Sequence, residues 1–147
     1  MSAILSALKT APLIAGLLLA GATTASAAEP LEDTSALVTI GGSVTEIVYA
    51  LGAGDAVIGR DTTSTYPPEA LALPDIGYMR QLSPEGILSV NPSAIISIEG
   101  AGPPETMEVM EKADVDLAFV PEDYSHNGII EKVMTIGTLL GREAEAR

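Results

Sequence analysis

Cysteine and tryptophan are absent from this chain of 147 residues, which contains one phenylalanine, one histidine and four tyrosines. Without cysteine there is neither a disulfide nor a thiolate metal site, and the single His126 cannot form a ligand cluster. So few aromatic rings argue against a surface that stacks nucleic-acid bases. The 7 basic residues are outnumbered by 20 acidic ones, and the net charge of −13 repels nucleic acid. We therefore expect no nucleic-acid partner.

The first 27 residues have the pattern of a secretory signal peptide. Lys9 gives a thin positive start, residues 13–21 (LIAGLLLAG) form an apolar core, and Ala25-Ser26-Ala27 is a small-x-small cleavage site. The core is short for a bilayer span, which favours a cleaved signal over a membrane anchor. We expect an exported protein whose mature domain is residues 28–147.

Short apolar strands alternate with helical patterns along the mature part. Strands are expected at residues 37–40, 56–59, 94–98 and 116–120, and helices at 43–51, 68–73, 84–90, 104–113 and 127–140. The last helix carries an apolar stripe that is expected to face the core and that begins at Ile129. This alternation predicts an α/β fold with a parallel sheet.

Two of these helices begin with capping signals. Ser43 and Glu46 have the spacing of a capping box, in which Ser43 is the N-cap. Ser83 has the form of an N-cap, and the proline and acidic Glu85 that follow are both favourable in a first turn. Residues 141–147 carry no strong stop signal, so the last helix is expected to be free to continue past the end of this chain.

Ligands of open α/β sheets bind beyond the carboxyl ends of the strands. The segments expected at that edge are residues 41–43, 60–65, 77–81, 99–103 and 121–125. Ser43 would be the nucleophile of a hydrolase there, but the sequence shows no base beside it and the capping box accounts for it. The chain is therefore predicted not to be an enzyme.

Tyr78 and Arg80 form the more informative pair at this edge. A tyrosine phenolate can ligate ferric haem, and a nearby guanidinium favours the phenolate by its charge and its hydrogen bonds. Residues two apart in a loop can both face a cleft. The same two residues also fit a packing tyrosine with a wet tip beside a surface arginine.

Three stretches of the sequence carry a family likeness. They are GGSVTEIVYALGAG (41–54), DTTSTYPP (61–68) and LPDIGYMRQLSPEGILS (73–89). Together they resemble the periplasmic haem-binding proteins of bacterial haem ABC importers, and the Gly-Tyr-x-Arg-Gln-Leu-Ser string is the most specific part. The remainder is shared with cobalamin- and siderophore-binding relatives of the same superfamily.

This resemblance implies a protein of two α/β lobes with the ligand in the cleft between them. The chain would be the N-terminal lobe only, a Rossmann-like parallel-sheet lobe that stops before or within the interlobe helix. Tyr78 would be the axial ligand of the haem iron, and Arg80 would polarise it. Glu85 would dock onto the permease, although it also fits a simple helix-dipole carboxylate. The cleft wall would be the segment Glu99, Gly100, Ala101 and Gly102.

The resulting hypothesis is a periplasmic binding protein that captures haem and delivers it to an inner-membrane ABC permease. An outer-membrane haem receptor system is a candidate partner upstream. The nearest alternative is a cobalamin- or ferric-siderophore-binding protein, for which Tyr78 would be only a wall aromatic. A periplasmic hydrolase that uses Ser43 and a non-transport interaction module are the alternatives from other classes.

Overall fold

The computed structural model of the chain describes residues 28–147. The predicted signal peptide, residues 1–27, lies outside the described residues. Within the described part, no helix combines the length and the apolar character that a membrane span requires.

A parallel sheet forms the centre of the domain. Its strands are β1 (Leu37–Ile40), β2 (Val57–Arg60), β3 (Ala94–Ile98) and β4 (Asp116–Val120). The strand order is β2-β1-β3-β4, and each neighbouring pair is parallel. Every residue of the central strands β1 and β3 is buried, as their nearly continuous apolar runs require when helices cover both faces. The predicted α/β fold is confirmed.

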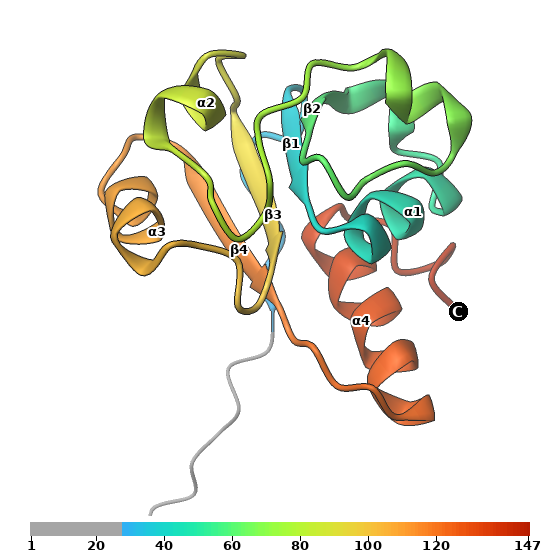
Figure 1. Cartoon of the computed structure of the whole chain (residues 1–147). Coiled ribbons are helices and arrows are strands. Elements are labelled where there is room, and N and C mark those ends of the chain that lie inside the picture. Colours follow the sequence, from blue (N-terminus) through green and yellow to red (C-terminus); the bar gives the residue numbers. More distant parts are fainter. Residues whose placement is uncertain (1–27) are drawn as a thin grey trace, which may run out of the picture.

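Helices cover the two faces of the sheet in pairs (Figure 1). One face carries α1 (Gly42–Ala50) and α4 (His126–Leu139), and the other carries α2 (Pro84–Leu88) and α3 (Pro104–Glu111). Two short 3₁₀ helices, η1 (Gly54–Ala56) and η2 (Pro68–Ala72), flank β2 in the chain.

The core is divided by the sheet into two clusters, because successive strand side chains point to opposite faces. Leu37 and Ile96 pack with the residues of α1 and α4. Val38 and Ile95 pack on the other side, with residues of α2 and α3. Burying an aliphatic side chain of this size stabilises a fold by roughly 1.5–3 kcal/mol, so both clusters contribute substantially.

The start of α1 differs from the prediction. The helix begins at Gly42 with Gly41 as its N-cap, and no side chain caps it, so the capping box of Ser43 and Glu46 is wrong. Gly41 has φ 104°, and a Cβ there would lie 2.9 Å from Ile98 Cγ2. The close approach of the β1–α1 turn to β3 therefore selects glycine, and the N-cap lies two residues before the predicted Ser43. The predicted N-cap Ser83 of α2 is confirmed, since its hydroxyl accepts a hydrogen bond from the Gly86 N–H at 3.0 Å.

Both ends of α4 also differ from the prediction. The helix begins after Ser125, whose hydroxyl caps the Gly128 N–H, and Ile129 in its first turns is 59% exposed rather than buried. These turns extend beyond the sheet in Figure 1, and within the described part of the chain Ile129 and Ile130 remain exposed there. The helix ends at Leu139 because Gly141 adopts φ 64° and closes a Schellman motif. The expectation that the last helix continues past residue 147 is therefore wrong, because α4 ends at Leu139.

Candidate functional site

Four loops follow the carboxyl ends of the strands and meet at one edge of the sheet (Figure 1). They follow β1, β2, β3 and β4 in turn, and the segment before α2 joins them. This is the edge where parallel α/β sheets bind ligands. What these loops hold in place determines what the edge presents to a ligand.

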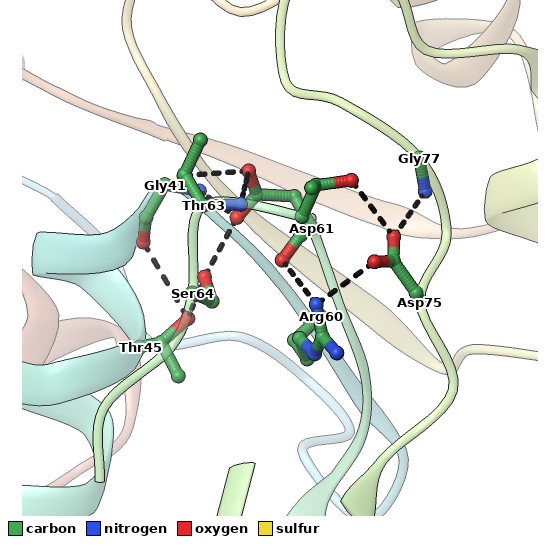
Figure 2. A network of polar contacts seen from close by, with 9 residues as sticks. Gly41, Thr45, Arg60, Asp61, Thr63, Ser64, Asp75 and Gly77 are labelled. Carbon is green, nitrogen blue, oxygen red and sulfur yellow. Dashed lines mark hydrogen bonds and ion pairs between the residues drawn. The ribbon is translucent and has the colours of Figure 1, made fainter. Parts of the chain in front are cut away.

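A buried carboxylate, that of Asp61, joins the first two loops (Figure 2). Its Oδ1 accepts hydrogen bonds from the Gly41 N–H at 2.9 Å and the Ser64 hydroxyl at 2.6 Å. Its Oδ2 accepts from the N–H and the hydroxyl of Thr63, at 2.9 and 2.6 Å. A buried charge is tolerated only when it is compensated in this way, so the arrangement locks the β1–α1 turn onto the loop after β2.

Buried hydroxyl groups extend this network into α1. Ser64 Oγ lies 2.7 Å from Thr45 Oγ1, which in turn lies 2.8 Å from Thr39 Oγ1 of β1. The three hydroxyls satisfy one another inside an otherwise apolar layer. Sequence reasoning missed this row of hydroxyl groups. The signal that marks it is the presence of the polar residues Thr39 and Thr45 at otherwise apolar positions.

A second carboxylate, Asp75, connects the end of β2 with the segment before α2 (Figure 2). Arg60 Nη1 donates to Asp75 Oδ2 at 2.9 Å and to the Asp61 carbonyl at 3.1 Å. Asp75 Oδ1 accepts from the Thr62 hydroxyl at 3.1 Å and the Gly77 N–H at 2.9 Å. Burial alone would raise the pKa of Asp75, but these donors and the Arg60 charge outweigh it and hold that pKa below its ordinary value.

The segment anchored in this way carries the predicted iron ligand, Tyr78. Its side chain is 42% exposed and Arg80 is exposed as well. Within residues 28–147 no hydrogen bond or ion pair joins Arg80 to Tyr78. The polarising role of Arg80 therefore stays a prediction.

The Tyr78 segment and the loop after β3 are held together by their backbones. Gly102 N–H donates to the Met79 carbonyl at 2.8 Å, and Leu82 N–H donates to the Gly102 carbonyl at 2.9 Å. The structure therefore brings the predicted wall segment 99–102 beside Tyr78. Glu99, at the start of that segment, is exposed and accepts a long hydrogen bond of 3.4 Å from the Glu122 N–H of the next loop. Their roles toward a ligand remain predictions.

Lys132 is a buried cation at this edge that sequence reasoning missed. It is 5% exposed, and its Nζ donates to Glu122 Oε1 at 2.7 Å and to Ser43 Oγ at 3.2 Å. It thus ties α4 to the start of α1 and to the loop after β4. A nitrogen does stand beside Ser43, but it is an ammonium donor paired with a carboxylate and does not face Ser43 as a free base. A lysine within the apolar stripe of α4 was the available signal.

Glu85 is exposed in the first turn of the short helix α2, on the face of the sheet that α3 shares. Within residues 28–147 no hydrogen bond or ion pair joins the Glu85 side chain to Tyr78 or Arg80. An open hollow of about 600 Å³ lies at the opposite, amino end of β3 and β4. Its lining carries five carboxylates, and among the described residues no group of histidine or acidic side chains is arranged to hold a metal ion. The lining acids are Glu32, Asp33, Glu111, Asp114 and Asp116.

A parallel-sheet lobe with its loops gathered at the carboxyl edge is the architecture of one half of a two-lobe binding protein. The chain belongs to the periplasmic binding protein family, whose model matches residues 37–147. It is similar to the solved periplasmic haem-binding protein RhuT from Roseiflexus sp. RS-1, with 42% identity and a TM-score of 0.74. That likeness covers 78% of this chain and 44% of RhuT.

Two curated relatives extend the comparison. An uncharacterised ABC transporter substrate-binding lipoprotein, YvrC of Bacillus subtilis, is 27% identical over 117 residues, which are 78% of this chain and 37% of YvrC. A vitamin B12-binding protein of Vibrio cholerae is 32% identical over 71 residues, 48% of this chain and 26% of that protein. The chain therefore spans less than half the length of the proteins it matches. YvrC is by its name a substrate-binding protein of an ABC transporter, and the Vibrio cholerae protein is by its name a vitamin B12-binding protein.

Proposed function

We propose that this protein captures haem in the periplasm, after export by its signal peptide, and delivers it to an ABC permease of the inner membrane. An outer-membrane haem receptor system would supply the haem. Tyr78 would bind the ferric iron through its phenolate oxygen, with Arg80 polarising that oxygen. The cleft wall beside it would be Glu99, Gly100, Ala101 and Gly102.

The observation that carries this proposal is the presentation of Tyr78. Its phenol is partly exposed on a segment whose two ends are fixed, by Asp75 before it and by Gly102 after it. A ligand residue must be accessible to the metal yet held in place, because metal–ligand distances tolerate little displacement. The likeness to a haem-binding protein at 42% identity supports the same ligand class.

This chain covers less than half of RhuT and of YvrC, and we expect this to limit its affinity for haem. Ligand sites of this kind bury most of the ligand surface, and one lobe offers only one wall. We expect this chain alone to bind haem weakly, and the same chain joined to a second lobe to bind it tightly. The acidic surface adds no attraction for the haem propionates.

A haemin titration followed by absorbance tests the proposal. The chain is compared with Tyr78→Phe, which keeps the ring and removes the oxygen, and with the matched control Tyr124→Phe, whose tyrosine is 87% exposed. A high-spin ferric, phenolate-type spectrum that disappears only in Tyr78→Phe is the expected result. A spectrum that survives in Tyr78→Phe, or that also disappears in Tyr124→Phe, would contradict ligation by Tyr78.

Cobalamin is the second candidate ligand, because a relative with 32% identity is a vitamin B12-binding protein. A parallel titration with cyanocobalamin separates the two ligands. Cobalamin binding that is unchanged in Tyr78→Phe, without haemin binding, would support the cobalamin alternative. In that case Tyr78 would serve only as an aromatic wall.

Permease docking is proposed for Glu85, which is exposed at the start of α2 and free of ion pairs among the described residues. The substitution Glu85→Lys should leave haemin binding unchanged and reduce haem uptake by the cell. Its helix-dipole contribution of about 0.3–1 kcal/mol is measured separately by urea unfolding. Normal uptake in Glu85→Lys would leave only that structural role.

A further inference from the structure

The backbone on both sides of Tyr78 is fixed by hydrogen bonds, and within residues 28–147 only one of the segment's backbone N–H groups donates to a side chain, that of Asp75. Gly77 donates its N–H to the Asp75 carboxylate at 2.9 Å, and its carbonyl accepts from the Thr62 N–H at 2.9 Å. After Tyr78, the Met79 carbonyl accepts from the Gly102 N–H at 2.8 Å. The last two are backbone–backbone bonds, which a substitution leaves intact. Asp75 is therefore the side chain whose substitution removes a hydrogen bond from the backbone of this segment.

The Asp75 carboxylate is itself held from the end of β2. Arg60, which is buried at the end of that strand, donates to Oδ2 at 2.9 Å, and the Thr62 hydroxyl donates to Oδ1 at 3.1 Å. Both atoms of the carboxylate are thus occupied by groups from the sheet edge. The carboxylate joins a rigid strand to the residue that precedes Tyr78.

The conformation of Gly77 adds to this control. Gly77 has φ 111°, a conformation that L residues other than glycine rarely adopt, and open space surrounds the position of a Cβ. No atom outside the adjoining residues lies within 4 Å of that position, and Gly77 itself is held by its hydrogen bonds to Asp75 and Thr62. Without the bond to Asp75, one hydrogen bond fewer would fix the path of the backbone into Tyr78.

We propose that Asp75 is a positioning residue that fixes the phenol of Tyr78 in the geometry required to bind haem iron. This inference rests on the proposed function. Asp75 does not touch the ligand and acts through Gly77. The charge on Asp75 serves its bond to Arg60, whereas its Oδ1 atom accepts the Gly77 N–H and so acts on the Tyr78 segment.

Four variants of the full chain separate these roles. Asp75→Ala removes both carboxylate oxygens, whereas Asp75→Asn keeps an Oδ1 acceptor for Gly77 and loses the ion pair with Arg60. The matched control is Asp33→Ala, because Asp33 Oδ1 accepts the N–H of Ser35 at 2.8 Å in the same two-residue spacing, at the opposite end of the sheet. Should Asp75→Ala fail to fold, Thr62→Val removes one contact to Oδ1 from an exposed position.

Haemin affinity and the phenolate-to-iron charge-transfer band are measured for each variant. We expect Asp75→Ala to weaken binding about tenfold and to diminish the band, since one charged hydrogen bond is lost from the segment. Thr62→Val should weaken haemin binding in the same direction but less, about two- to threefold. Asp75→Asn should keep the band, and Asp33→Ala should match the wild type. An unchanged band and affinity in Asp75→Ala would overturn the inference.

Amide hydrogen exchange without haemin makes the test independent of the ligand. Asp75→Ala should accelerate exchange at Gly77, and Asp33→Ala should not. If the wild type binds no haemin but Gly77 still responds, the proposed function fails while Asp75 keeps control of the segment. If neither binding nor exchange responds to Asp75→Ala, Asp75 has no positioning role.

Discussion

The two ends of the parallel sheet use acidic side chains in opposite ways. At the carboxyl edge, Asp61 and Asp75 are saturated with hydrogen-bond donors from three segments of the chain. At the amino end, five acidic residues line an open hollow, where Asp33 and Asp116 each accept a hydrogen bond from one backbone N–H. The same residue types therefore join several loops at one end and line an open surface at the other. What decides the outcome is the number of donors that meet each carboxylate, because Asp61 is buried whereas the Asp75 side chain is 41% exposed.

The largest expected difference between the two ends comes from removing one acid at each. Asp61→Ala leaves the donors of Gly41, Thr63 and Ser64 without their acceptor, and we expect a loss of about 3–5 kcal/mol in the free energy of unfolding. Asp114→Ala in the hollow should change it by less than about 0.5 kcal/mol. Urea denaturation followed by circular dichroism measures both. Equal effects would mean that the two ends do not differ in this way.

Two glycines sharpen the comparison at the level of the backbone. Gly41→Ala combines φ 104° with a Cβ that would meet Ile98 at 2.9 Å, and it should cost about 2–3 kcal/mol. Gly141→Ala, after α4, has φ 64° and open space around its Cβ, and it should cost about 1 kcal/mol. Thermal unfolding ranks the two variants. A larger effect at Gly141 would contradict the tight packing of the carboxyl edge.

The acid dependence of stability compares Asp75 with Asp33. The folded-state pKa of Asp75 is lowered by its donors despite burial, so its contribution to stability is present above the ordinary carboxyl pKa of 3.8. That contribution is lost as the pH falls through the lower, folded value. The difference between wild type and Asp75→Asn should therefore be constant from about pH 5.5 to 7 and shrink below about pH 4.

Asp33 provides the counterpart of this measurement without an ion pair. The hydroxyl and then the N–H of Ser35 lower its pKa, so Asp33→Asn should give the same sign. The amplitude should be smaller, because within residues 28–147 Asp33 forms no ion pair, whereas Asp75 is paired with Arg60. Urea unfolding from pH 2.5 to 7 records both curves. Wild-type and Asp75→Asn curves that stay parallel down to pH 3 would show that Asp75 is not coupled to folding.

The smallest expected effect is a gain at the acidic hollow. Asp114→Lys replaces one of five like charges, and relief of repulsion should stabilise the chain by about 0.2–0.5 kcal/mol at low salt. In about 1 M salt the gain should vanish, because screening then acts within roughly 3 Å. A gain that persists at high salt would indicate a specific new contact instead of relieved repulsion.

Most of the fold followed from local patterns. The strands at 37–40, 94–98 and 116–120 agree with the prediction. For β1 and β3 the reason is that burial on both faces of a sheet leaves continuous apolar runs in the sequence, whereas the edge strand β4 is only partly buried. The start of α2 agreed as well, since the Ser83 hydroxyl caps the helix by accepting the N–H of Gly86, only three residues further along the chain. The sequence also contains the signal for the end of α4, because a glycine such as Gly141 is a common stop signal just after a helix.

The candidate site was predicted only in part. The Tyr78 segment precedes α2 and residues 99–102 follow β3, and the two lie side by side as expected. Parallel strands bring their carboxyl ends to one edge, where such segments gather. The carboxylates that organise that edge were not found. Asp61 and Asp75 look in the sequence like ordinary loop acids, and Lys132 looks like an exception on an apolar helix face.

Local pattern alone therefore settles the order of strands and helices, the parallel sheet and the edge at which a ligand would bind, because periodicity and capping depend on near neighbours in the chain. The tertiary structure decides which polar groups are buried and which donors each one meets. Asp61 gains its partner Gly41 from 20 residues away, and Lys132 reaches Ser43 across 89. Such pairings depend on the packing of separate loops and helices, and no short window of sequence contains both partners.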